Sequence, residues 1–277
     1  MTRKIFMLVS VASILFDMNG LKAQSPVPQK AIVSSELNFA STAAQRGLKY
    51  AFEQNLDSLG IIASGVHLVN GLKAYAKVKA NTTDLLVWYP SFAFTNLSED
   101  FGFTTGPYLY YGHRGQQAIA SGNYFSIWKK NSDQQFKLLF DGGVNHTSIY
   151  PDYHQAVQTL NTQLTAFKKS TKKAPTAPPT LAATNEAFHY LDEEVLLLRA
   201  DAPIRLGKMH YAPTNDELRY LPKQNGYDES GRFYYVVGNL YDRHSTIDIN
   251  KIKGFYAQVW RFNKKWTIVA DVVQLAN

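Results

Sequence analysis

The chain has 277 residues, with 29 lysines and arginines against 22 aspartates and glutamates and a formal net charge of +7. Apolar residues make up 45% and charged residues 18% of it, a globular balance that excludes an intrinsically disordered chain. It contains no cysteine, which excludes disulfides, cysteine-ligated zinc, iron–sulfur clusters and a cysteine nucleophile. The length is sufficient for two domains of about 100–150 residues each.

The N-terminus has the pattern of an export signal. Arg3 and Lys4 precede a short apolar stretch at residues 5–16, and the small residue Ala23 precedes Gln24. This order predicts a signal peptide over residues 1–23 and a periplasmic or secreted mature chain. The apolar stretch is too short for a bilayer core of about 30 Å, so no stable membrane span is expected after cleavage. An uncleaved N-terminal anchor is the alternative.

A lysine- and proline-rich segment divides the chain in the middle. Residues 168–180 carry three prolines and four lysines with no large apolar residue, which predicts an extended linker. Before it, residues 152–167 place apolar side chains at three- to four-residue spacing, which predicts a short amphipathic helix. The predicted organisation is therefore a first domain at residues 32–150, the helix and linker at residues 151–180, and a second domain at residues 181–277.

The two halves resemble each other in sequence. Residues 88–90, 101–106 and 122–129 match segments that lie 132 positions later, and residues 136–141 match a segment 130 positions later. Four segments in one order at nearly one offset indicate a duplicated domain rather than a short solenoid repeat.

Each half is expected to begin with a helix and to end in strands. Helical spacing covers residues 35–55, with Ser34 or Ser35 as the N-cap, and residues 180–198. Strands are predicted at residues 85–95, 101–111, 118–130 and 135–144, with hairpin turns at residues 131–133 and 262–264. Helices followed by a run of strands predict the α+β class.

Several motifs carry a resemblance to a known family. Residues 86–90, 98–107 (SEDFGFTTGP), 122–130 (GNYFSIWKK) and 136–141 (FKLLFD) resemble a nuclear transport factor 2-like (SnoaL-like) domain over residues 34–144. The second half is similar more weakly, over residues 181–275. The resemblance implies two cone-shaped domains, each a curved mixed or antiparallel sheet wrapped around N-terminal helices, with a cavity at the wide end. Such cones occur in isomerases, cyclases, dehydratases and non-catalytic binders, so the fold does not give the function.

Metals, cofactors and nucleic acid are not expected. The seven histidines show no ligand spacing, and no nucleotide-binding or serine-nucleophile motif occurs. Without residues 1–23 the chain carries 26 basic and 21 acidic residues. Lysines of the linker supply four of these five excess charges, so the folded halves are close to neutral and lack the basic surface of a nucleic-acid binder.

Asp141 and Asp271 are the candidate ionisable groups. Each lies late in the last predicted strand of its half, two residues after Leu139 or Val269. A carboxyl group among apolar side chains facing a cavity would have a raised pKa, as a general base requires, and Asp141 is the candidate catalytic residue. The alternative is that each carboxylate ends its strand or pairs with a backbone or basic group.

Aromatic side chains are the second candidate feature. They alternate along the predicted strands and could line a pocket for a flat apolar ligand together with Asp141 and Asp271. The alternative is that they belong to the core or to a dimer surface. The candidate pocket aromatics are Trp88, Tyr108, Tyr124, Trp128, Tyr256 and Trp260.

Three functions remain open from the sequence. The leading one is an exported, non-catalytic protein that binds a small apolar ligand. The second is an isomerase or cyclase of the SnoaL or ketosteroid isomerase type that uses Asp141 as a general base. The third is a structural module in which the halves dock as an intramolecular pseudo-dimer, or the chain forms a homodimer.

Overall fold

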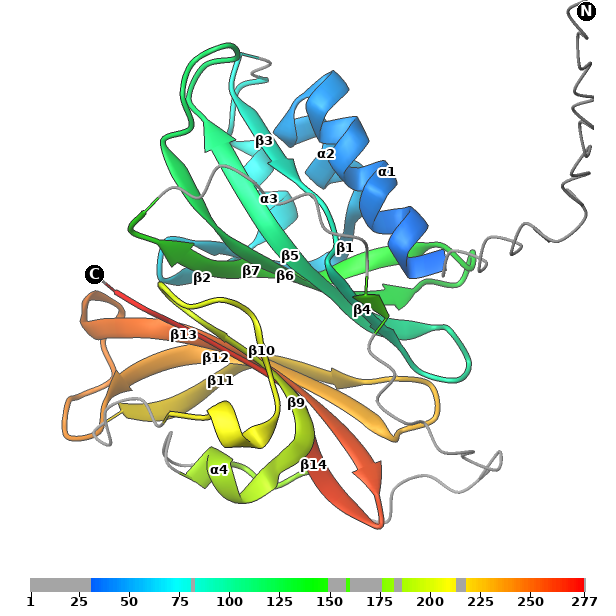
Figure 1. The fold of residues 1–277 in the computed structure, drawn as a ribbon, viewed down its shortest axis with the longest axis vertical. Coiled ribbons are helices and arrows are strands. Elements are labelled where there is room, and N and C mark those ends of the chain that lie inside the picture. The colour runs from blue at the N-terminus through cyan, green and yellow to red at the C-terminus, as the bar shows by residue number, and fades with distance from the viewer. Residues whose placement is uncertain are drawn as a thin grey trace, which may run out of the picture.

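The computed structural model describes residues 31–80, 83–148, 158–159, 176–181, 186–212 and 218–276. We call residues 31–159 the first half and residues 176–276 the second half. Each half forms one sheet with few helices, which confirms the α+β class (Figure 1). Among the described residues, no helix is long and apolar enough to cross a membrane.

The first half places three helices against an eight-stranded sheet. Its strand order is β2-β1-β7-β6-β5-β4-β8, and β3 also pairs with β5. The elements are α1 (Ala31–Arg46), α2 (Leu48–Asn55), β1 (Leu56–Ser64), β2 (His67–Asn70), α3 (Gly71–Ala76), β3 (Leu85–Trp88), β4 (Phe92–Thr95), β5 (Phe101–Tyr111), β6 (Ala120–Lys130), β7 (Phe136–His146) and β8 (Gln158–Thr159).

The helix predicted over residues 35–55 is two helices. Gly47 separates α1 from α2 with φ 86°, a conformation that glycine adopts without the steric penalty of a Cβ. Helix α1 also includes Ala31, so Ser34 and Ser35 lie within the helix and neither is its N-cap. The break lets the two helices pack separately on the sheet.

The second half is a six-stranded sheet in the order β10-β9-β14-β13-β12-β11. Its elements are α4 (Ala187–Tyr190), β9 (Leu191–Arg199), β10 (Arg205–Leu206), the 3-10 helix η2 (Lys208–His210), β11 (Leu218–Tyr227), β12 (Phe233–Asp242), the 3-10 helix η3 (Ile249–Lys251), β13 (Ile252–Asn263) and β14 (Lys265–Leu275).

The prediction of a helix over residues 180–198 is wrong for most of the residues that the structure describes there. Only α4 is helical, and the apolar run that follows is strand β9, which pairs in parallel with β14. Val195 and Leu197 pack on one side of this strand, and Leu196 and Leu198 pack on the other. Because both faces are buried, the run lacks the alternation of a half-exposed strand and resembles a helix in sequence.

The strands predicted in the first half are largely confirmed, with one interruption. Residues 85–95 form two strands, β3 and β4, on either side of Tyr89, Pro90 and Ser91. Residues 101–111, 118–130 and 135–144 correspond to β5, β6 and β7. The predicted turn at residues 131–133 joins β6 to β7. Of the turn predicted at residues 262–264, only Lys264 lies between β13 and β14, and the other two residues end β13.

Some predicted segments fall largely outside the described residues. The signal peptide at residues 1–23 lies entirely outside them. Of the helix predicted at residues 152–167, only Gln158–Thr159 is described, and these two residues form strand β8 beside β4. Residues 176–180 of the linker are described, and the carbonyl of Thr176 accepts a hydrogen bond from the indole N–H of Trp266 at 2.8 Å.

The two sheets have matching strand pairing. Asp141 lies opposite Ser126 and beside Ile62, whereas Asp271 lies opposite Gln258 and beside Leu197. Both β1–β7 and β9–β14 are parallel, and both pairings carry an irregularity at the corresponding position. The register therefore places the two aspartates at equivalent points of the two sheets.

The sheets pack face to face and share one hydrophobic core. Phe233 of β12 lies 5.3 Å from Phe94 and 6.3 Å from Phe101, measured between ring centroids. Asn96 donates a hydrogen bond to Asp228 at 3.0 Å across the same interface. Helices α1, α2 and α3 cover the opposite side of the first sheet, away from the second half (Figure 1).

Candidate functional site

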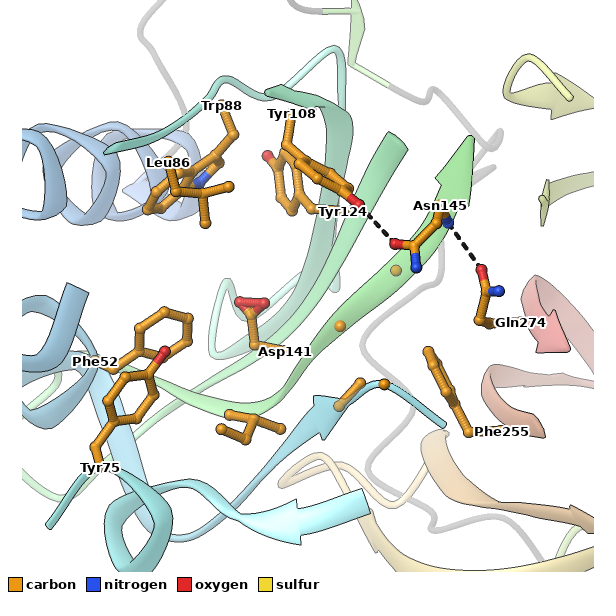
Figure 2. A pocket seen from close by; sticks show the side chains of 15 residues that line it. Phe52, Tyr75, Leu86, Trp88, Tyr108, Tyr124, Asp141, Asn145, Phe255 and Gln274 are labelled. Carbon is orange, nitrogen blue, oxygen red and sulfur yellow. Dashed lines mark hydrogen bonds between the residues drawn. The ribbon is translucent and has the colours of Figure 1, made fainter. Parts of the chain in front are cut away.

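A pocket of about 250 Å³ lies between the first sheet and its helices. Aromatic and aliphatic side chains form most of its wall, and the carboxyl group of Asp141 points into it (Figure 2). We call it the Asp141 pocket. The lining side chains from the first half include Phe52, Ile62, Tyr75, Leu86, Trp88, Tyr108, Tyr124, Asp141 and Asn145.

Strand β6 separates the pocket from the core between the sheets. Phe125 and Ile127 face the second half, whereas Tyr124 and Trp128 face the helices, because successive side chains of a strand point to opposite faces. Tyr124 therefore reaches the pocket wall. Trp128 is fully buried below it and is absent from the lining.

A buried glutamate lies beneath the pocket. Glu36 of α1 accepts hydrogen bonds from the indole N–H groups of Trp88 and Trp128, the latter at 3.0 Å, and from the hydroxyl of Thr104. These contacts join α1 to β3, β5 and β6. Burial raises the pKa of Glu36, while the hydrogen bonds from Thr104, Trp88 and Trp128 act to lower it.

The carboxyl group of Asp141, a residue of intermediate exposure, has no hydrogen-bond partner among the side chains and backbone groups that the structure describes. Burial raises its pKa well above the ordinary range, and the nearby charge of Glu36 raises it further. Asp141 is therefore protonated at a pH where an exposed aspartate is charged, and its O–H is available to a ligand.

The hydroxyl of Tyr124 is a second polar group without a bond of normal geometry to any described residue. Burial raises its pKa well above that of a free tyrosine, with a further contribution from Glu36. The Thr104 side chain acts to lower this pKa, and the charge of Asp141 raises it further. Tyr124 and Asp141 both line the pocket, and each can supply a hydrogen-bond donor there.

Tyr108 and Asn145 form the far end of the pocket. The Tyr108 hydroxyl donates to Oδ1 of Asn145 at 2.6 Å (Figure 2). Burial raises the pKa of Tyr108 to about 12, so it stays protonated at neutral pH. Since its proton is committed to Asn145, the oxygen of Tyr108 can act as an acceptor toward a ligand.

The corresponding region of the second half is arranged differently. Asp271 is fully buried, bonded to the guanidinium of Arg199, and accepts a hydrogen bond from Gln258 at 2.7 Å. Tyr256 and Trp260 line a cavity of only about 40 Å³, which has room for water rather than for an organic molecule. Of the predicted site residues, four line the Asp141 pocket and Trp128 is buried outside it. Asp271, Tyr256 and Trp260 belong to the second half. The four are Trp88, Tyr108, Tyr124 and Asp141.

Three contributors to the site were missed by sequence reasoning. Glu36 had a detectable signal, since it falls on the apolar stripe of α1 between Ile32 and Phe39. Phe255 and Gln274 belong to the second half and reach the pocket only because the sheets dock. No group of three or more potential metal ligands occurs among the described residues.

Comparison with known proteins identifies structural neighbours but no family. No protein-family model and no curated protein matches the chain. A candidate ketosteroid isomerase from Shewanella frigidimarina NCIMB 400 is similar at 14% identity and a TM-score of 0.32, over 40% of this chain and 92% of that one. An Ntf2-like protein involved in plasmid conjugation is similar at 10% identity and a TM-score of 0.20, over 88% of this chain and 98% of that one.

Proposed function

We propose that the Asp141 pocket binds one compact, flat and largely apolar ligand that carries a hydrogen-bond-accepting oxygen, such as a carbonyl. The observation that carries the proposal is the Asp141 carboxyl, which points into the pocket without a hydrogen bond to any described residue, together with the Tyr124 hydroxyl, which makes no hydrogen bond of normal geometry to one. Asp141 is partly exposed within the pocket, so its carboxyl is open to a ligand oxygen, and the buried Tyr124 hydroxyl is a second group that a ligand could satisfy.

The size and wall of the pocket limit the ligand. A volume of about 250 Å³ is below the range of about 300–1,000 Å³ for drug-sized ligands, which favours a molecule of one or two rings. The aromatic wall favours a flat apolar body. We further propose that each half is a cone-shaped nuclear transport factor 2-like domain, and that the protein acts after export, as residues 1–23 suggest.

The test compares 1-indanone with indane, which has the same rings without the carbonyl. We expect the wild-type chain to bind 1-indanone more tightly, by about 2- to 12-fold for each hydrogen bond made. Asp141→Asn keeps a donor and should keep this preference, whereas Asp141→Leu and Tyr124→Phe should reduce it. Absence of saturable binding of either compound at millimolar concentration would contradict the proposal.

A second candidate function is catalysis with Asp141 as a general base. The raised pKa of this carboxyl and the neighbouring Tyr124 hydroxyl favour it, because proton transfer is most effective when the pKa of the base is near the working pH. The same Asp141→Asn variant separates the two functions. It should retain binding of 1-indanone in either case, and a loss of turnover on a substrate would favour catalysis.

The third candidate function is structural, with the halves acting as an intramolecular pseudo-dimer. The shared core between the two sheets supports it. Light scattering of the mature chain tests this idea: a monomer is expected if the two halves satisfy each other's sheet face, and a concentration-independent dimer would contradict it.

A further inference from the structure

The second half forms one side of the Asp141 pocket. Phe255 of β13 and Gln274 of β14 both line it, although the other described lining residues belong to the first half. Figure 2 shows Gln274 beside Asn145 and Phe255 on the same side, both at the end of the pocket opposite Phe52. The pocket is therefore composite, and its shape depends on how the two sheets dock.

Gln274 is held in a defined position. Its Oε1 accepts a hydrogen bond from the backbone N–H of Asn145 at 2.8 Å, and its Nε2 donates to the carbonyl of Leu275 at 2.7 Å. The residue is only 4% exposed, so water does not compete effectively for these bonds. The side chain thus links β14 of one sheet to β7 of the other.

The contact continues into the pocket. Asn145 donates its backbone N–H to Gln274 and accepts the Tyr108 hydroxyl with its side chain, so a shift of Gln274 is passed on to Tyr108. A relay of two hydrogen bonds connects Gln274 to the Tyr108 hydroxyl without Gln274 itself having to touch the ligand.

The second half also holds the turn between β1 and β2. Asn239 donates to the carbonyl of Val66 at 3.0 Å, and the ammonium of Lys223 donates to the carbonyl of Leu68. Gly65 in the same turn lines the pocket. Contacts from the second sheet therefore flank the pocket on two sides.

We propose that Gln274 is a positioning residue, through which the second half orients Tyr108 as a hydrogen-bond acceptor for the ligand. The inference rests on the proposed function and narrows the ligand class. The molecule would carry an accepting oxygen near Asp141 and a donating hydroxyl or amine at the opposite end, near Tyr108.

The first measurement does not require a ligand. In Gln274→Met, Asn145 loses the acceptor for its amide, and we expect hydrogen exchange at that amide to become about tenfold faster or more. Gln258→Met is the matched control, because it removes another buried glutamine of the second sheet that does not line the pocket. Unchanged Asn145 exchange in Gln274→Met would overturn the inference.

The second measurement uses the probe 5-hydroxy-1-indanone beside 1-indanone. We expect the hydroxyl to improve binding to the wild-type chain several-fold, and Tyr108→Phe and Gln274→Met to lose this gain while Gln258→Met keeps it. If 1-indanone binds but Gln274→Met keeps the gain, the positioning role fails and the proposed function stands. If neither probe binds, the proposed function fails, and the exchange of the Asn145 amide decides the positioning role.

Discussion

Asp141 and Asp271 occupy equivalent positions in the two sheets but have opposite surroundings. Asp271 is bonded to Arg199 and Gln258, whereas the Asp141 carboxyl has no hydrogen-bond partner among the described residues and faces a pocket. In the register of the first sheet, Ser64 takes the place that Arg199 has in the second. The aspartate of the second half is therefore neutralised by a salt bridge, whereas the aspartate of the first half faces an open pocket.

Removing the basic partner of Asp271 should destabilise the chain. Arg199→Met leaves a fully buried carboxylate without its cation, and we expect a loss of about 3–5 kcal/mol in the free energy of unfolding. The double variant Arg199→Met/Asp271→Leu replaces both charges by apolar groups and should recover most of this loss. Urea denaturation measures both, and a single variant as stable as the wild type would show that the pair is dispensable.

Asp141 should make stability depend on pH. Its pKa is higher in the folded state than the value of about 3.9 in an unfolded chain, so the folded protein keeps the proton over a range in which the unfolded chain releases it. The contribution is fully present below about pH 4 and is lost as the pH rises toward the folded pKa, by up to about 1.4 kcal/mol per pH unit.

Asp141→Asn removes this titration, and its free energy of unfolding should vary less between pH 5 and pH 8 than that of the wild type. Urea denaturation at the two pH values checks this. Identical pH dependence in both proteins would mean that Asp141 is ionised in the folded state at pH 5.

Glu36 should stabilise the first half and raise the pKa of Asp141. Glu36→Gln leaves one acceptor oxygen for Trp88, while Trp128 can still donate to the hydroxyl of Thr104 at 3.1 Å. We expect a loss of about 1–2 kcal/mol, because hydrogen bonds to a charged acceptor are stronger than those to a neutral one. The variant also removes a negative charge, so stability should fall less steeply with pH. Glu53→Gln, in a partly exposed ion pair with Lys49, is the control and should change stability by less than about 1 kcal/mol.

The two halves should unfold together. Phe233→Ala removes a ring that packs on Phe94 and Phe101 of the other sheet, and we expect a loss of about 3–5 kcal/mol. Because the core is shared, near-UV circular dichroism and tryptophan fluorescence should report one transition in the wild type. Two separated wild-type transitions would show that the sheets are independent.

Strands of the first half could be predicted because their composition and turns agree. The aromatic and β-branched strands at residues 101–111 and 135–144 end at turn residues, and the structure places β5 and β7 there. Strand β9 could not be recognised, because burial on both faces removes the alternation that identifies a strand. Gly47 was missed as a helix break since a single glycine is compatible with a helical pattern.

The site could be predicted only in part, because much of it depends on docking. Asp141 and Tyr124 follow from strand alternation within one half. The roles of Gln274 and Arg199 depend on side-chain contacts between strands far apart in the sequence, which one sequence does not indicate. Equivalent aspartates in similar sequence motifs have therefore acquired different environments.

The most direct test of the account is a crystal structure of the full chain soaked with 1-indanone, beside the same soak of Asp141→Leu. We expect one indanone in the Asp141 pocket, with its carbonyl oxygen within about 3 Å of the Asp141 carboxyl and the Tyr124 hydroxyl, and none in the variant in that orientation. An indanone bound only elsewhere, such as against Tyr256 and Trp260, or bound identically in Asp141→Leu, would contradict it.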